Sequence, residues 1–256
     1  MDAYWSDVPQ ENAKHKPSNS IAFDSDFTLS KWHSGGTNFN DYSPMDFENR
    51  LFVKLALSEM IKKGVKVCII TSALNKYVVP WYTKLFADTG IVISNGVYAP
   101  GALTIYAPEN YKDRNLAGIK VKNMGEFLSK SSPDPIYETT FVDDDVDNIT
   151  AMQGTYPEYP EGASHVNCLL SKTVVDAHNR TAEGLYKETI RLANETLHPS
   201  MRIDIKGIEE YVNIEVVKYN EILYERRGWG GKHKRKSVKR KNKRKRETKT
   251  RRRRRT

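Results

Sequence analysis

The chain has 256 residues, 38% of them hydrophobic and 29% charged, which is enough for one α/β domain with a buried core and additional segments. It contains no apolar run near 18 residues, and its first residues have neither a basic region nor an apolar core. We therefore expect neither a membrane span nor a secretion signal. Cys68 and Cys168 each lie in an apolar run, which favours two reduced core cysteines and an intracellular protein.

The net charge of +9 is distributed unevenly. Residues 232–256 hold 17 of the 41 Lys and Arg residues and one of the 32 Asp and Glu residues, a net charge of +16. The remaining 231 residues have 24 basic and 31 acidic side chains, a net charge of −7. The sequence therefore combines a mildly acidic body with a strongly basic tail.

In chain order, residues 1–17 are polar and are predicted to be a flexible arm. A strand over 20–23 ends at Asp24, and a turn-rich loop over 30–42 follows it. Ser43 and Pro44 are typical of a helix N-terminus, and Gly64 is typical of its end. The elements predicted after this helix are a strand over 65–70, a helix over 77–88 with Pro80 near its first turn, a strand over 91–93, a hairpin over 95–107, a helix over 122–130, strands over 139–142 and 165–170, a helix over 181–196 and a helical or mixed segment over 204–225.

Strands that alternate with helices predict a parallel sheet with helices on both faces. Ligands bind such sheets at the carboxyl ends of the strands. Asp24, Thr71 and Asp143 each follow a predicted strand directly. We therefore expect a functional site at this edge of the sheet.

Two acidic motifs carry the candidate chemistry. The first, Asp24-Ser25-Asp26-Phe27-Thr28, follows a strand, although an acidic turn is an alternative interpretation. The second runs from Asp143 to Asn148 and places adjacent carboxylates past another strand, where a solvated acidic loop is the alternative. Close carboxylates repel each other unless a cation neutralises them, and oxygen ligands of this kind suit Mg²⁺.

Taken together, the motifs resemble those of the haloacid dehalogenase superfamily. Four can be placed in order: IAFDSDFT (21–28), VCIITSA (67–73), a lysine near GIKVKNM (118–124) and FVDDDVDNI (141–149). The resemblance covers residues 18–170. It implies a Rossmann-like three-layer sandwich whose five strands, numbered along the chain, have the order 5-4-1-2-3.

The resemblance also implies the roles of the site residues. Asp24 would attack phosphorus and form an aspartyl-phosphate, and Asp26 would serve as general acid and then as general base. A phosphate dianion accepts a carboxylate nucleophile only when its charge is neutralised. A bound Mg²⁺ would neutralise this charge. Its ligands would be Asp24, the backbone carbonyl of Asp26 and Asp144, with Asp143 assisting.

Phosphate binding is assigned to Thr71, Ser72 and a lysine. Lys112, Lys120 and Lys122 all lie in the right part of the chain, and we favour Lys122 over Lys120 because Lys122 begins the predicted helix. The sequence departs from the family pattern at Phe27, where the family usually has Gly. The intervals between the motifs are too short for a full cap domain, so we expect an open site that favours nucleic acid ends or phosphoproteins and also admits small nucleotides. His33, in the 30–42 loop, could touch substrate or be an ordinary loop residue.

The sequence suggests three parts: the arm over 1–17, a phosphatase-like domain over 18–227 with a helical extension over 171–227, and a glycine hinge with the basic tail over 228–256. The tail has too few apolar residues to form a core, so we expect it to be disordered. Residues 232–256 would bind nucleic acid or another polyanion without reading its sequence. A nuclear-localisation signal is an alternative, so a nuclear or virion-associated protein is compatible with the tail.

Two further functions fit the same sequence. One is a non-catalytic nucleic-acid-binding protein that combines a phosphatase-like fold with the basic tail. The other is a phosphotransferase or phosphomutase, which would share the aspartyl-phosphate.

Overall fold

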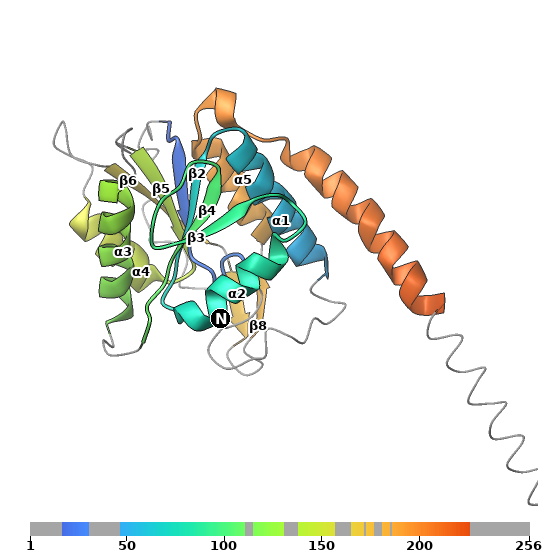
Figure 1. Cartoon of the computed structure of the whole chain (residues 1–256), viewed down its shortest axis with the longest axis horizontal. Helices are drawn as coiled ribbons and strands as arrows, with labels where there is room; N and C mark the ends of the chain where they lie inside the picture. The colour runs from blue at the N-terminus through green and yellow to red at the C-terminus, as the bar shows by residue number, and fades with distance from the viewer. Residues whose placement is uncertain are drawn as a thin grey trace, which may run out of the picture. The chain divides into compact units, whose positions relative to one another are not determined.

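The computed structural model describes residues 17–30, 47–110, 115–130, 138–156, 165–171, 173–176, 181–184 and 186–225. The predictions for the N-terminal arm, His33, Ser43, Pro44 and the basic tail lie outside these residues. Within them the fold is α/β, as predicted, with helices on both faces of a parallel sheet (Figure 1).

The central sheet has six strands, and every pair of neighbours is parallel. Its strands are β1 (Ser20–Phe23), β2 (Lys66–Ile70), β3 (Val92–Asn95), β4 (Ala102–Tyr106), β5 (Glu138–Asp143) and β6 (His165–Leu170). Their order across the sheet is β3-β4-β2-β1-β5-β6. Strand β1 is therefore central, and its register aligns Phe23 with Ile69 of β2 and with Val142 of β5.

The predicted strand order was wrong at one edge of the sheet. The order 5-4-1-2-3 makes the strand near 91–93 a neighbour of β2, but β4 lies between them. The hairpin predicted over 95–107 was also wrong, because β3 and β4 pair in parallel. Gly96 and Gly101 have positive φ, so both lie in turns, which explains why their positions in the sequence suggested a hairpin. All five residues of β4 are buried, as expected for an interior strand of a parallel sheet and not for an edge hairpin.

Helices cover both faces of the sheet (Figure 1). On one side, α1 (Phe47–Lys62) packs on β2 and α5 (Tyr186–Thr196) packs on β5. On the other side, α3 (Leu116–Lys130) packs on β2, and α4 (Val146–Thr155) packs on β5 and β6. Helix α2 (Asn75–Leu85) contacts β3 at the edge. A core of apolar side chains lies between the sheet and the α3–α4 layer; it includes Ala22, Cys68, Ile70, Met124, Phe127, Phe141 and Met152.

Three helices differ from their predicted bounds. Helix α3 begins at Leu116 and not at 122, because Asn115 caps it by accepting a hydrogen bond from the Gly118 amide at 2.8 Å. Helix α2 begins at Asn75, so Pro80 lies inside it and not in its first turn. The first residues of the helix predicted over 181–196 are instead the strand β8 (Thr181–Gly184), which pairs antiparallel with β7 (Thr173–Asp176), and α5 follows.

The chain divides into two compact units, residues 1–209 and 210–256. The helix over 205–225 matches the predicted helical segment and provides the described residues of the second unit, and a short 3₁₀ turn, Pro199–Met201, precedes it. The expected boundary at the glycine-rich segment 228–231 lies outside the described residues and stays a prediction.

Both cysteines are free. Among the described helices, none has the length and apolar character needed to cross a membrane.

Candidate functional site

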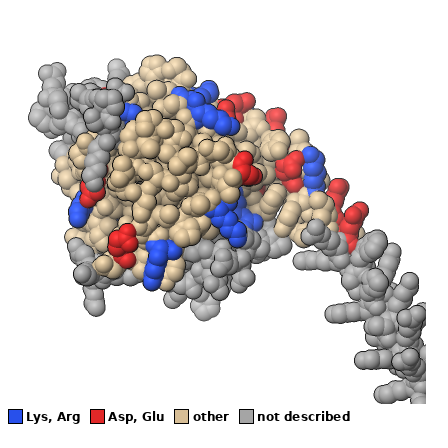
Figure 2. All heavy atoms as spheres, in the orientation of Figure 1, with Lys and Arg blue, Asp and Glu red and all other residues tan. Residues whose placement is uncertain are grey.

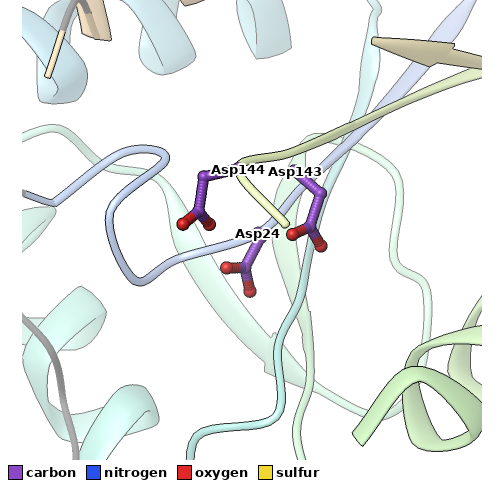
Figure 3. A group of neighbouring side chains, drawn as sticks. All are labelled: Asp24, Asp143 and Asp144. Carbon is purple, nitrogen blue, oxygen red and sulfur yellow. The ribbon is translucent and has the colours of Figure 1, made fainter. Parts of the chain in front are cut away.

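Three aspartates meet where two adjacent central strands end. Asp24 follows β1, Asp143 is the last residue of β5, and Asp144 comes next. The backbone amide of Asp24 donates to the carbonyl of Val142 at 2.8 Å, which extends the β1–β5 pairing to the site itself. One carboxylate oxygen from each aspartate lies within 4.8 Å of the others, and the three carboxylates point toward one another (Figure 3). The parallel sheet thus brings the two acidic motifs together, as the sequence predicted.

A buried lysine from α3 connects two of these carboxylates. The Nζ atom of Lys120 lies 2.7 Å from Oδ2 of Asp143, to which it donates a hydrogen bond, and 3.1 Å from Oδ1 of Asp24. The side chains of Lys120, Asp24 and Asp143 are 3%, 5% and 0% exposed. Although burial lowers the pKa of Lys120, Asp24 and Asp143 together raise it above its usual value, so the ammonium stays charged.

One ammonium does not neutralise three carboxylates, and the pKa values reflect this. Burial raises the pKa of Asp24 well above its usual value, and the charges of Asp143, Asp26 and Asp144 add to the effect, against the opposing charge of Lys120. Burial and the charge of Asp143 raise the pKa of Asp144 to about 6. With all three aspartates ionised, the group has a net charge of −2, which one divalent cation would balance.

Asp143 is held in a fixed orientation by three donors. In addition to the bond from Lys120, its Oδ1 accepts from the Asn148 side chain and from the Asp145 backbone amide, both at 3.0 Å. Asp145 is the N-cap of α4 and accepts from the Asp147 amide at 2.9 Å. The start of α4 therefore positions Asp143. Sequence reasoning gave Asn148 no role, although its place in the first turn of α4, five residues after Asp143, was a signal that could have identified it.

The loop after β1 is held against the second motif and against α2. The hydroxyl of buried Thr28 donates to Oδ1 of Asp144 at 3.2 Å, which joins the two acidic motifs directly. The hydroxyls of Ser25 and buried Tyr82 lie 3.2 Å apart. Phe27, where the resembled family has Gly, has φ 58 and is the non-glycine residue with positive φ among the described residues. A side chain in this left-handed region carries a conformational cost that Gly avoids.

Thr71 lies at the carboxyl end of β2 and is buried. Its hydroxyl oxygen accepts from the Ala73 amide at 3.2 Å, so the hydroxyl proton is available to a further acceptor. Its backbone amide donates to the carbonyl of Tyr106 in β4 at 3.1 Å. Ser72 is the next residue of this loop and is half-buried. Both residues thus follow the strand adjacent to β1, as the sequence predicted.

No protein-family model, curated protein or solved structure matches this chain. The interpretation of the site therefore depends on its geometry and on the motif pattern.

The preference for Lys122 was wrong, because Lys120 contacts the aspartates while Lys122 lines a cavity beside α3. The error follows from the predicted start of α3: with the helix beginning at Leu116, Lys120 lies in its second turn and Lys122 is about 200° further around the axis. Lys112 lies outside the described residues. Asp26 is half-buried and close enough to raise the pKa of Asp24, but its assignment as acid, base and metal ligand stays a prediction.

The donor set fits a hard divalent cation. The three converging ligands are carboxylate oxygens, which Mg²⁺ prefers to nitrogen or sulfur. Oδ1 of Asp24 is buried and, despite its 3.1 Å distance from Lys120, lacks a hydrogen bond of good geometry from any described residue. Lys120 is shared between Asp24 and Asp143, so its single positive charge does not balance both buried carboxylates. Asp24 and Asp144 would hold the ion, and Asp143, already bonded by three donors, would assist.

Proposed function

We propose that this protein is a Mg²⁺-dependent phosphohydrolase that resembles the haloacid dehalogenase superfamily and uses Asp24 as a covalent nucleophile. The observation that carries the proposal is the convergence of Asp24, Asp143 and Asp144 on one point, with Lys120 as an internal counter-ion. The order of the four motifs and the parallel sheet support it. Mg²⁺, when bound, would neutralise charge on the phosphate and on the attacking carboxylate.

Hydrolysis would proceed through two displacements at phosphorus. In the first, a carboxylate oxygen of Asp24 forms a bond to phosphorus, and the bond from phosphorus to the leaving oxygen breaks. Asp26 gives its proton to that leaving oxygen. In the second, a water molecule attacks the aspartyl-phosphate and gives a proton to Asp26, so that inorganic phosphate leaves and Asp24 is restored.

The surrounding residues would bind and orient the phosphate. The available hydroxyl proton of Thr71 can be donated to a phosphate oxygen, and Ser72 follows it in the same loop. Lys120 supplies a positive charge beside Asp24. Thr28 and Asn148 hold Asp144 and Asp143 in place, which reduces the reorganisation needed when charge moves during the reaction.

Nucleic acid is the partner that the charge distribution favours. On the face shown in Figure 2, basic and acidic side chains lie among each other on a mostly uncharged surface. The concentrated positive charge is in residues 232–256, at +16. We propose that this segment binds a polyanion through its phosphates, and that the catalytic site acts on a phosphate carried by nucleic acid or by a nucleotide.

The direct test is hydrolysis of p-nitrophenyl phosphate by the full-length protein with Mg²⁺, after EDTA, and by the Asp24→Asn variant. We expect turnover with Mg²⁺, and at most a few per cent of it after EDTA or in Asp24→Asn. Asp88→Asn is the matched control, because Asp88 is an exposed carboxylate paired only with Lys54 among the described residues, and it should keep full turnover.

Three results would contradict the proposal. Full turnover after thorough chelation would exclude the metal assignment. Substantial turnover by Asp24→Asn would exclude the covalent nucleophile. A protein that binds DNA but hydrolyses none of a screen of nucleotides, sugar phosphates, phosphopeptides and phosphorylated oligonucleotides would be the non-catalytic nucleic-acid-binding protein and not a phosphohydrolase.

A further inference from the structure

A cavity of about 490 Å³ lies beside the candidate active site. Its walls come from three places: Asn95 and Gly96 at the end of β3, the segment 106–110 after β4, and α3. It therefore lies at the carboxyl ends of two parallel strands, where α/β sheets bind ligands. Its volume is in the range of small-molecule sites, roughly 300–1,000 Å³.

The cavity shares structural elements with the phosphate-binding loop. Thr71 donates its backbone amide to the carbonyl of Tyr106 at 3.1 Å, and Asn75 donates its backbone amide to the carbonyl of Pro108 at 2.9 Å. The 71–75 loop is thus bonded at both ends to a wall of the cavity. On α3, Lys120 reaches Asp24, and the preceding residue, Ile119, lines the cavity. The cavity and the candidate active site are thus built in part on the same loop and the same helix.

Two buried polar groups on the cavity wall lack a partner. The hydroxyl of Tyr106 and the Nδ2 atom of Asn123 are both buried, and neither makes a hydrogen bond to any residue that the structure describes. An unpaired buried donor costs roughly 1–3 kcal/mol. Both residues line the cavity, but these two atoms are themselves covered, so a polar group bound there would recover this cost once the side chains turn toward it.

The other polar residues of the wall identify the chemistry of that group. Three carboxamides (Asn95, Asn110 and Asn123) and two carboxylates (Glu109 and Glu126) line the cavity. Lys122 on the same wall offsets one of these two negative charges, and the charge that remains disfavours a second anionic group at this place. Carboxamide and carboxylate side chains are the groups that bind the edges of nucleobases, for example Asn with adenine and Glu with the amino group of cytosine. A neutral base therefore fits the lining better than a second phosphate does.

We propose that this cavity holds the nucleobase of a nucleotide, free or at the end of a strand, whose phosphate is bound at Asp24. This inference rests on the proposed function, because it names the substrate class of the same site. The base contacts Asn123 and Tyr106, and the sugar bridges the distance between the cavity and the 71–75 loop.

Binding of nucleosides without phosphate tests the cavity independently of catalysis. We would titrate adenosine, guanosine, cytidine and uridine into the full-length protein by calorimetry, for wild type, Asn123→Asp and Tyr106→Phe. Asn123→Asp replaces a donor by an acceptor at constant shape, so the Kd for at least one nucleoside should rise about tenfold. Asn213→Asp adds the same charge at an exposed position of the 205–225 helix and should leave the Kd unchanged. Tyr106→Phe removes only a hydroxyl, so it tests the cavity even if Asn123→Asp impairs folding.

Kinetics provide the second arm. The ratio of kcat/KM for a nucleoside monophosphate to kcat/KM for p-nitrophenyl phosphate should fall about tenfold in Asn123→Asp, because only the first substrate carries a base. Failure of all p-nitrophenyl phosphate turnover would contradict the proposed function, while the nucleoside titration would still decide the role of the cavity. Absence of nucleoside binding at millimolar concentration, equal binding by wild type and both variants, or equal efficiency on ribose 5-phosphate would overturn the nucleobase assignment.

Discussion

At the residue scale, the candidate site is a group of carboxylates with too little positive charge of its own. Lys120 donates a hydrogen bond to Asp143 and lies 3.1 Å from Asp24, whereas the side chain of Asp144 accepts, among the described residues, the hydrogen bond from the Thr28 hydroxyl. The pKa of Asp144 is accordingly raised to about 6, by burial first and by the charge of Asp143 second. The ionisation of Asp144 should therefore depend on a bound cation.

This shift predicts how stability depends on pH without metal. Between pH 4 and 6 the folded protein retains a proton on Asp144 that the unfolded chain has released, so the contribution of Asp144 to stability is lost as pH rises through this window. Asp144→Asn removes the titration. At pH 7.5 in EDTA, the variant should be more stable than wild type by about 2 kcal/mol, a rise in Tm of several degrees.

Thermal melts of wild type and Asp144→Asn from pH 4 to 8, in EDTA and in Mg²⁺, measure this effect. Mg²⁺ should raise the Tm of wild type strongly and that of the variant little. Asp145→Asn is the matched control, because Asn is as good an N-cap as Asp and should keep the wild-type pH profile. A variant that is less stable than wild type at pH 7.5 in EDTA would contradict the account.

Phe27 offers a second test at this scale. Its φ of 58 is in the region that disfavours any residue with a Cβ. Phe27→Ala and Phe27→Gly both remove the ring, but only Gly also removes the Cβ. Denaturant unfolding should find Phe27→Gly more stable than Phe27→Ala by about 1 kcal/mol. In an ordinary conformation the order reverses, because Gly loses more backbone entropy on folding, so a more stable Ala variant would exclude the left-handed conformation.

At the element scale, the start of α3 determines which lysine reaches the aspartates. Asn115 accepts from the Gly118 amide at 2.8 Å and fixes the helix to begin at Leu116. Replacing this cap with Ala should reduce the free energy of unfolding by about 1 kcal/mol, whereas Asn115→Asp should keep it because Asp caps equally well. Denaturant titration of both variants measures the difference. Equal stability of the two would mean that the cap does not hold the helix terminus.

The same elements show what could be predicted from the sequence. The strands that end at Asp24, Thr71 and Asp143 were predicted because short apolar runs before polar residues are a local pattern. The choice of lysine failed because the predicted helix began at 122, although Ala117, Val121 and Met124 already have helical spacing. The position of β4 between β2 and β3 depends on long-range pairing, and the glycines at 96 and 101 suggested a hairpin instead.

At the scale of the whole molecule, catalysis and nucleic acid binding should be separable. Removal of residues 232–256 takes away a charge of +16 and leaves the described site residues in place. Turnover of p-nitrophenyl phosphate should change little, whereas binding to duplex DNA should be largely lost. Wild-type binding should weaken with salt, with a log–log slope of about −0.9 per contacted phosphate.

Titration of a fluorescent duplex at two salt concentrations, for the full-length and truncated proteins, measures this separation. For a phosphorylated oligonucleotide, loss of the tail should raise KM and leave kcat unchanged, because the tail contributes equally to substrate and transition-state binding. Equal, salt-independent binding by the truncated protein would contradict a role of the tail in binding.

The central claim is that Asp24 forms a bond to phosphorus, and trapping that bond tests it most directly. The full-length protein is mixed with Mg²⁺ and p-nitrophenyl phosphate, quenched in acid within one turnover, digested and analysed by mass spectrometry. We predict one phosphoryl group on Asp24 in wild type, a larger amount in Asp26→Asn because breakdown of the intermediate lacks its general base, and none in Asp24→Asn. Continued Mg²⁺-dependent turnover without a phosphorylated Asp24, or a phosphoryl group on another residue, would contradict the account.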